Sequence, residues 1–315
     1  MTELPPDPLV VWCVTDHKPG HESQLRGLLQ ALASRHRLDL TWIDARQPLY
    51  RRTAPRHGRP DFIIAAGHGT HLRALLMKWW YGGQAVVLMK PSLPRGLFDL
   101  CIVPEHDGVA TENNVLATVG TLNDIVPGRE RDPGRGLVML GGPSKHHDWS
   151  DEEMVAQLRR LKALLPGVRW TLTTSRRTPA TFTDAVVPLL DQHCVLVPHQ
   201  QTDREWLREQ YCRSGVIWVT EDSASMVYES LATGAAVGVL GVPRSRDSRV
   251  SRGLDRLLES GALATLQQVE AQGAMPPGTG RLSEADRVAE YIDTHLYKGG
   301  LAALDESPAG FTQSQ

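Results

Sequence analysis

The hydrophobic positions of the chain fall into short, nearly uninterrupted runs that alternate with segments of helical spacing. Runs such as LVVWCVT (9–15) and DFIIAAG (61–67) are apolar at almost every position, which is typical of strands buried on both faces of a sheet. Between them, Leu25, Leu28 and Leu32 recur at helical spacing and predict an amphipathic helix. This alternation of strand and helix predicts an α/β fold with parallel sheets.

The alternation occurs twice along the chain. We expect two doubly wound Rossmann-like domains, residues 1–132 and 133–280, that face a central cleft. The segment 127–136, PGRERDPGRG, is charged, rich in Pro and Gly and free of other apolar residues, so we interpret it as the interdomain linker. A Ser-x-x-Asp capping pattern at Ser283 begins a last helix within residues 281–315, which could pack back on the N-terminal domain before a frayed tail.

Composition excludes several classes of protein. The 34 Lys and Arg residues nearly balance 36 Asp and Glu, so a net charge of -2 gives no general attraction to nucleic acid. Four widely spaced cysteines without a CxxC pair favour buried thiols over disulfides or zinc. No apolar run approaches the roughly 20 residues of a membrane span, and no signal-peptide pattern is present. We expect a cytoplasmic protein and leave open a peripheral contact with the inner face of a membrane.

The first candidate loop, DHKPGHESQ, follows the first predicted strand. Five ionisable side chains and one glycine fall within seven residues there: Asp16, His17, Lys18, Gly20, His21 and Glu22. We interpret this loop as a catalytic loop on the acceptor side, in which a histidine or a carboxylate is the general base and the glycine lets the backbone contort. The alternative is an ordinary helix N-terminus, where acidic residues favour the helix dipole.

Two further loops add candidates on the same side. In AAGHGTH, Gly67 and His68 stand between a strand and a helix, where a ligand could approach the backbone closely and the helix N-terminus could hold an anion. A tight βα turn is the alternative, and His68 with His71 would need further partners to bind a metal. Lys90 follows the next strand and is either a ligand of the same cleft or a solvated lysine.

The second half offers a comparable pair of loops. In LGGPSKHHDW, Gly141 and Gly142 could free backbone N–H groups to cradle a phosphate, while Ser144 and Lys145 add a hydroxyl and a positive charge. The loop lacks the GK[ST] of a P-loop, which disfavours an NTPase. Arg176 and Arg177 end the following strand and suit a diphosphate, although a solvated arginine pair is the general alternative.

The segment TEDSASMVYES carries the last candidates. It places acidic and hydroxyl side chains between a strand and a helix: Glu221, Asp222, Ser223, Ser225 and Glu229. The hydroxyls stand beside the free N–H groups of the first helical turn, and a carboxylate on the helix can accept hydrogen bonds from ribose hydroxyls. This pattern favours a nucleotide site.

The ordered motifs DHKPGHESQ, GHGTH, VVLMKPSLP, FDLCIVPEHD, LGGPSKHH, SRRTP and TEDSASMVYES resemble the mitochondrial fission "elongated mitochondria" family and its bacterial homologues, which are classed with GT-B glycosyltransferases. The resemblance extends from about Val11 to Pro243. It implies a transferase that moves a sugar from a nucleotide-diphosphate donor to a cell-envelope or lipid-linked acceptor, with no metal and no other cofactor. The donor would bind the second domain and the acceptor the first.

The resemblance also assigns roles to the candidates. His21 or Asp16, with His17 behind them, would deprotonate the acceptor in an inverting reaction, and Glu229 would face the ribose. Two other functions stay open: a non-catalytic GT-B-like scaffold related to organelle-fission factors, and a nucleotide-sugar 2-epimerase. The base, the sugar, the acceptor, the stereochemistry and the oligomeric state are not determined by the sequence.

Overall fold

The computed structural model describes residues 7–48, 58–127, 131–246, 248–278 and 280–297. The chain divides into two compact units. The first contains the chain up to Val103, Ala110–Thr118 and the chain from Glu284 onward, and the second contains Pro104–Val109 and Val119–Ser283. The predicted boundary after residue 132 therefore lies inside the second unit, because the segment after Thr118 already packs there.

The first unit is built on a sheet whose described strands have the order β2-β1-β3-β4-β5-β6. Their bounds are Leu9–Thr15 (β1), Leu38–Asp44 (β2), Phe62–Ala66 (β3), Gln84–Leu88 (β4), Leu100–Pro104 (β5) and Val115–Thr118 (β6). β1 pairs in parallel with β2 on one side and with β3 on the other, so Cys13 lies between Trp42 and Ile64. The chain thus reverses its direction of winding between β1 and β3, which opens the loops after these two strands.

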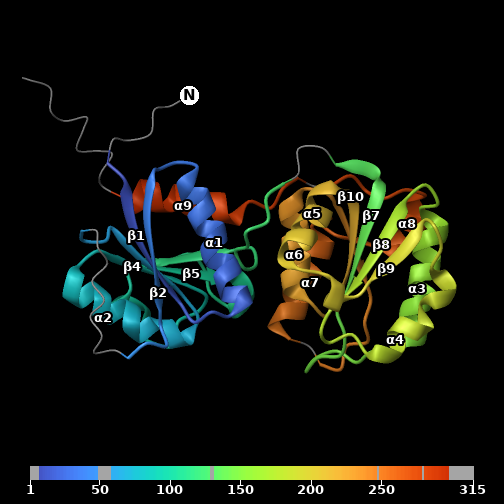
Figure 1. Cartoon of the computed structure of the whole chain (residues 1–315), viewed down its shortest axis with the longest axis horizontal. Coiled ribbons are helices and arrows are strands. Elements are labelled where there is room, and N and C mark those ends of the chain that lie inside the picture. Colours follow the sequence, from blue (N-terminus) through green and yellow to red (C-terminus); the bar gives the residue numbers. More distant parts are fainter. Residues whose placement is uncertain (1–6, 49–57, 128–130, 247, 279, 298–315) are drawn as a thin grey trace, which may run out of the picture. The chain divides into compact units, whose positions relative to one another are not determined.

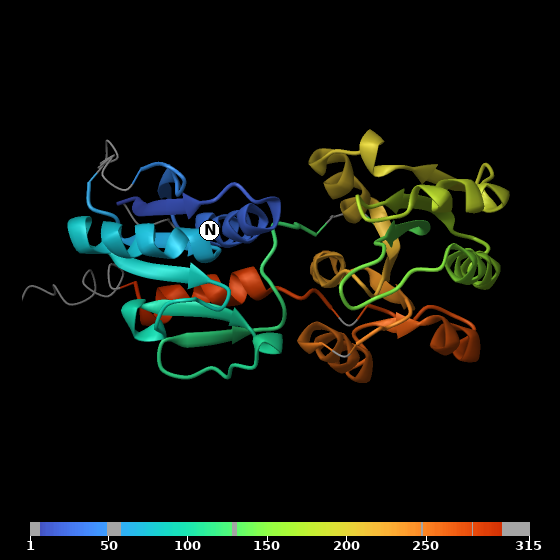
Figure 2. The ribbon, with the colours of Figure 1, turned by 90° about the horizontal axis from the view of Figure 1, so that it is seen from below.

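Helices cover both faces of this first sheet. They are α1 (Pro19–Ala33), α2 (His71–Tyr81), the short turns η1 (His68–Thr70) and η2 (Arg95–Leu97), and α9 (Glu284–His295). Figures 1 and 2 show α9, in orange-red, among the elements of the first unit, and it packs against α1. Asp293 of α9 accepts a hydrogen bond from His36 Nε2 (2.6 Å), and Gln84 Nε2 donates to the carbonyl of Leu296 (2.8 Å). These bonds join the end of the described chain to the first sheet.

The second unit repeats the arrangement with described strands in the order β12-β11-β10-β7-β8-β9. Their bounds are Asp132–Leu140 (β7), Arg169–Thr174 (β8), Cys194–Val197 (β9), Ser214–Thr220 (β10), Ala236–Leu240 (β11) and Ala264–Thr265 (β12). β7 pairs in parallel with β8 and with β10. The winding therefore reverses between β7 and β10, and the loops after these strands diverge at the carboxyl edge of the sheet. The predicted α/β class with parallel sheets is confirmed.

Helices of the second unit form two layers. Figure 1 shows α5 (Arg204–Arg213), α6 (Ala224–Thr233) and α7 (Arg249–Glu259) on one side of the sheet, and α3 (Asp151–Leu164), α4 (Ala180–Ala185) and α8 (Leu266–Gln272) on the other. Short turns η3 (Glu105–Asp107), η4 (Val187–Leu189) and η5 (His199–Gln201) complete the unit. Alternate residues of β7 enter opposite cores, Leu137 and Met139 in one and Val138 and Leu140 in the other. This double burial explains why the strand is apolar without alternation.

Two details differ from the sequence interpretation. The interpretation of 127–136 as a linker is wrong for residues 132–136, which form the start of β7, because backbone pairing of Asp132 with Ser214 does not require apolar side chains. Residues 128–130 lie outside the described residues. The sequence interpretation also gave no elements between Gly241 and Pro276, where α7, β12 and α8 form. No helix within the described residues is long and apolar enough to cross a membrane.

Candidate functional site

The reversal point of the first sheet brings Asp16 and His21 together. Asp16 directly follows β1, and His21 lies in the first turn of α1. His21 Nδ1 lies 2.9 Å from Asp16 Oδ1, and the two side chains are 17% and 10% exposed. An imidazole held by a carboxylate on one nitrogen offers the other nitrogen to a ligand. The pair therefore has the form of a general base with an orienting carboxylate.

Asp16 also forms an ion pair with Lys18. Lys18 Nζ lies 3.0 Å from Asp16 Oδ2, and the Lys18 backbone N–H donates to Oδ1 (3.2 Å). Burial acts to raise the pKa of Asp16, but the hydrogen bonds from His21 and Lys18 outweigh it and lower the pKa below its ordinary value. Asp16 is consequently an ionised carboxylate at neutral pH and can accept a hydrogen bond from His21 Nδ1.

Gly67, which follows β3, packs closely against the imidazole of His21. Its φ is +92°, and a Cβ added there would lie 2.3 Å from both Cε1 and Nδ1 of His21. Only glycine combines this backbone conformation with such close approach. The loops after β1 and β3 therefore meet, as expected for a reversal point, and Gly67 belongs to the site by its backbone.

Two expectations for the first loop are wrong in detail. Gly20 lies in the first turn of α1, and the left-handed residue of the loop is His17 (φ 60°). His17 faces away from the His21–Asp16 pair, since its Nδ1 lies 3.1 Å from Glu22 Oε1 and its Nε2 lies 3.5 Å from Asp44. Glu22 and His17 thus form a separate ion-pair group, which does not support a role for His17 behind His21.

The other first-unit candidates lie around this pair. His68 is exposed, and its ring centroid is 5.7 Å from that of the buried His71. Burial, followed by the charges of His68 and His21, lowers the pKa of His71 to about 4, so His71 is neutral near pH 7. Lys90 is exposed after Met89, whose sulfur accepts a hydrogen bond from Gln24 (3.2 Å). No contact of Lys90 with the His21–Asp16 pair appears in the described structure.

In the second unit, Gly141 and Gly142 serve a different purpose from the one predicted. Gly141 N–H donates to Thr220 Oγ1 (2.7 Å), and Gly142 N–H donates to Asp222 Oδ2 (3.1 Å). The interpretation that these N–H groups are free to cradle a phosphate is therefore wrong. The glycines are needed for space, because a Cβ on Gly141 would lie 2.2 Å from the Asp222 carboxylate.

Asp222 and Arg177 form an ion pair inside this loop cluster. The Asp222 side chain has no exposed surface, and its Oδ2 lies 2.6 Å from Arg177 Nη2. Arg177 Nη1 donates to the carbonyl of Gly142 (2.9 Å). Both residues were predicted to contact a ligand, but their polar atoms are directed at each other and at the neighbouring backbone.

A pocket of about 600 Å³ opens at the carboxyl edge of the second sheet. It is lined by Ser175, Arg176, Arg177, His199, Ser223, Ser225 and Met226. Ser223 is the N-cap residue of α6, and its side chain makes no capping hydrogen bond in the described structure, so it does not accept from the first-turn N–H groups. A guanidinium, hydroxyls and a helix N-terminus in one pocket suit an anionic ligand.

The sequence interpretation missed two polar members of this pocket, Ser175 and His199, and the apolar Met226. Ser175 and His199 share one sequence signal. Both lie at the carboxyl ends of the predicted strands VRWTLTTS and CVLVPHQ, which is the position that marks the other candidates. His199 gives a weaker sequence signal, because no glycine-rich loop follows its strand.

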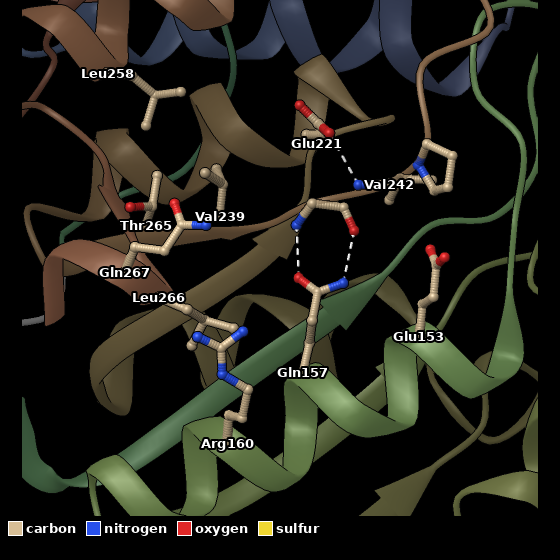
Figure 3. Close-up of a pocket in the computed structure, with 12 residues that line it drawn as sticks. Glu153, Gln157, Arg160, Glu221, Val239, Val242, Leu258, Thr265, Leu266 and Gln267 are labelled. Atoms are coloured by element: carbon tan, nitrogen blue, oxygen red, sulfur yellow. Dashed lines mark hydrogen bonds between the residues drawn. The ribbon is translucent and has the colours of Figure 1, made fainter. Parts of the chain in front are cut away.

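Glu221 does not join this pocket. Figure 3 shows it at a second pocket, of about 430 Å³, near Val242 and Gln157. Its Oε1 accepts the Val242 N–H (2.9 Å), and Arg244 donates to its Oε2 from Nη2 (2.7 Å). Glu221 was predicted among the donor-site residues, but its carboxylate is held by Val242 and Arg244 and lines the other pocket.

Ser144 and Lys145 are also outside the pocket lining. The Ser144 hydroxyl accepts the His146 N–H (3.3 Å) and lies 3.3 Å from His147 Nδ1. Its hydrogen bonds thus close its own turn. Lys145 is exposed on that turn. Of the three loop lysines that the sequence singled out, Lys18 is the one with an ion pair in the described structure.

Glu229 lies on α6, in the helix turn that follows the serines. Its Oε2 accepts a hydrogen bond from Tyr211 Oη (3.0 Å). Burial raises the pKa of Glu229 to about 7, against the opposing effect of the Tyr211 bond. Glu229 is not among the described residues that line the second-unit pocket, so its contact with a ribose diol stays a prediction.

Comparisons with solved structures give the fold a context. The chain is similar to MnaA from S. aureus in a structure with UDP (14% identity, TM-score 0.53, 96% of this chain and 100% of that one). It is similar to the UDP-GlcNAc 2-epimerase from Methanocaldococcus jannaschii (12%, 0.53, 91% and 100%) and to MurG from Acinetobacter baumannii (11%, 0.51, 91% and 100%). At these identities the likeness shows a GT-B-like fold.

A comparison at the level of sequence identifies the family. No curated protein sequence matches the chain. The family described as Mitochondrial fission ELM1 matches residues 19–296, a span that contains most residues of both units and nearly all the candidate loops. The chain therefore belongs to the Mitochondrial fission ELM1 family, as the resemblance of its loop motifs implied.

Proposed function

We propose that the protein is a glycosyltransferase that takes its sugar from a nucleotide-diphosphate donor. The observation that carries the proposal is the second-unit pocket, where Arg176, two serine hydroxyls and the N-terminus of α6 converge. A diphosphate matches this combination of a cation and N–H donors. The fold neighbours add support, since one is described with UDP and another acts on UDP-GlcNAc.

Glu229 is the proposed partner of the donor ribose. It lies on the same helix as Ser223 and Ser225, about one turn beyond the N-terminus. Tyr211 fixes one carboxylate oxygen at 3.0 Å, which leaves the other to accept from a ribose hydroxyl. In this proposal the diphosphate lies at the helix N-terminus and the ribose lies along the first turns of α6.

His21 is the proposed general base, on the first unit. It takes the proton of an acceptor hydroxyl on Nε2 while the acceptor oxygen forms a bond to the anomeric carbon of the sugar. The bond between that carbon and the diphosphate oxygen breaks, and the nucleoside diphosphate leaves with the electron pair. Asp16, 2.9 Å from Nδ1, stabilises the imidazolium that results.

The charge on the departing diphosphate is met by Arg176 and the α6 N-terminus in this scheme, without a metal ion or another cofactor. A cell-envelope or lipid-linked glycan is the acceptor that we propose. The acceptor would bind the first unit near His21, with Gly67 and His68 beside it.

A nucleotide-sugar 2-epimerase is the second candidate, because one of the similar solved structures is a UDP-GlcNAc 2-epimerase. The two functions differ in one observable. An epimerase converts the sugar nucleotide when no acceptor is present, whereas a transferase releases the nucleoside diphosphate only as its sugar is transferred to an acceptor or to water.

Calorimetric titration of the full chain with UDP, GDP and ADP, followed by their sugar conjugates, tests the proposal. We expect one base to bind in the micromolar range and Arg176→Gln to weaken that binding. Arg159→Gln, an exposed arginine on α3, is the control and should bind as the wild type does. A folded wild-type protein that binds none of these nucleotides would refute the proposed function.

A further inference from the structure

We propose that Arg177 and Asp222 lock together the loops after β7, β8 and β10, the last two of which line the second-unit pocket, and that Arg176 and His199 contact the diphosphate. The inference rests on the proposed function for the identity of the ligand. It divides two adjacent arginines, which the sequence presents as a pair, into a positioning residue and a binding residue.

The lock is built on the buried Asp222 carboxylate. Asp222 follows β10, Arg177 follows β8, and Gly142 follows β7. Asp222 Oδ2 receives the Gly142 N–H (3.1 Å) and the Arg177 guanidinium (2.6 Å), and the guanidinium also donates to the Gly142 carbonyl (2.9 Å). One carboxylate and one guanidinium therefore tie the carboxyl ends of three strands.

The loops after β7 and β8 pack so closely that neither backbone has room to shift toward the other. A Cβ on Gly142 would lie 2.2 Å from the carbonyl oxygen of Arg177. Asp222 Oδ1 is buried and has no hydrogen-bond partner in the described structure. The carboxylate thus depends on Arg177 for its charge balance, and removal of the guanidinium would leave a buried, uncompensated charge.

Arg176 has the opposite character. Its side chain is exposed and lines the pocket, and it makes no ion pair within the described part of the chain. Its guanidinium can turn to a ligand without breaking an internal bond. A planar guanidinium binds phosphate oxygens through two parallel hydrogen bonds, which suits the donor diphosphate.

His199 supplies the second contact. Its backbone N–H donates to Thr174 Oγ1 (3.0 Å), and its Nδ1 lies 3.3 Å from the same hydroxyl. A hydroxyl oxygen has two acceptor sites, so either atom of this contact can be the donor. In the tautomer in which Nδ1 accepts from Thr174, the ring carries its proton on Nε2 and can donate it to a phosphate oxygen.

Two measurements on the same variants of the full chain test the division: UDP affinity by calorimetry and the midpoint of thermal unfolding. We expect Arg176→Gln and His199→Phe to weaken UDP binding roughly 10-fold or more, with unchanged midpoints. Arg177→Gln should lower the midpoint by roughly 5 °C or more, and adding Asp222→Asn should restore most of it, because the double variant buries no unpaired charge.

Arg177→Lys keeps the positive charge and serves as the test variant if Arg177→Gln does not fold. We expect Arg177→Lys to lower the unfolding midpoint by less than Arg177→Gln does. The lock is refuted if Arg177→Gln melts as the wild type does and loses UDP as Arg176→Gln does. Pyrophosphate separates the two proposals. Binding of pyrophosphate but not UDP, with loss in Arg176→Gln, supports the division and refutes the proposed donor, whereas binding of neither refutes the ligand contacts.

Discussion

Tyr211 Oη donates a hydrogen bond of 3.0 Å to Glu229 Oε2, and this bond joins α5 to α6 in the second unit. Tyr211 is fully buried, and Glu229 is half-buried. Burial raises the pKa of the Tyr211 phenol well above its ordinary value, and the Glu229 charge raises it further, so the phenol stays protonated and remains a donor. The bond opposes the effect of burial on the pKa of Glu229, so a fraction of this carboxyl group is ionised at neutral pH.

The ionisation of Glu229 predicts how stability depends on pH. The pKa of Glu229 is about 7 in the folded protein against an ordinary value of 4.5, so its contribution is fully present below pH 4.5 and is lost as pH rises through 7. We expect Glu229→Gln to remove up to about 3 kcal/mol of this decline in unfolding free energy. Urea unfolding between pH 5 and pH 8 measures it, with the exposed Glu152→Gln as the control. Parallel pH profiles for wild type and Glu229→Gln would contradict the prediction.

His21→Ala should lower the transferase activity about 10²- to 10⁴-fold with little change in donor affinity, because it removes the proposed base and leaves the second-unit pocket unchanged. Asp16→Asn should give a smaller loss, since the histidine remains but its imidazolium is less stabilised. Initial rates of nucleoside diphosphate release with acceptor present measure the effect. His17→Ala is the matched control, because His17 is paired with Glu22 and Asp44. Equal losses in His17→Ala and His21→Ala would refute the assignment.

Gly67→Ala is expected to disturb the His21 site and to cost about 1–3 kcal/mol of stability. The substituted residue would have a φ of +92° and a Cβ 2.3 Å from the imidazole. Gly69→Ala, two residues later, has nothing within 4 Å of its added Cβ and should behave as the wild type does. Denaturant unfolding and the rate assay together check this. If both variants match the wild type, the close approach of the two loops is wrong.

Gly141→Ala is expected to destabilise the second unit by about 2–4 kcal/mol, because its Cβ would displace the buried Asp222 carboxylate from Arg177. Gly167→Ala, in the exposed turn between α3 and β8, meets no atom within 4 Å and is the control. Thermal unfolding of both variants without a nucleotide measures the difference. A Gly141→Ala protein as stable as Gly167→Ala would show that the loop can move aside.

Much of the fold could be predicted because burial on both faces of parallel strands imposes a local pattern. Leu9–Thr15 and Phe62–Ala66 are apolar at nearly every position, and the leucines of α1 recur at helical spacing. The start of β7 was missed because its pairing uses only backbone groups. α7 was missed although its amphipathic pattern is present in the sequence between Arg249 and Glu259.

The sequence predicted where the candidate site residues lie better than it predicted what each side chain contacts. Loops after strands collect at the carboxyl edge of a parallel sheet, so Asp16, His21 and Arg176 could be chosen from position alone. The partner of each side chain could not, because partners come from distant segments. Glu221 and Ser223 are two residues apart, yet Glu221 is held by Arg244 while Ser223 lines the pocket.

The sequence by itself determined the α/β class, the order of strand and helix, and the loops that hold the titratable groups, since these depend on local spacing and hydrophobicity. Only the tertiary structure decided which groups are free to act. It pairs Arg177 with Asp222 and leaves Arg176 exposed. It gives the N–H groups of Gly141 and Gly142 hydrogen-bond acceptors within the protein. It also places His21, rather than His17, against Asp16. The physical reason is that a hydrogen bond depends on a few ångströms and an angle, which chain neighbours alone do not set.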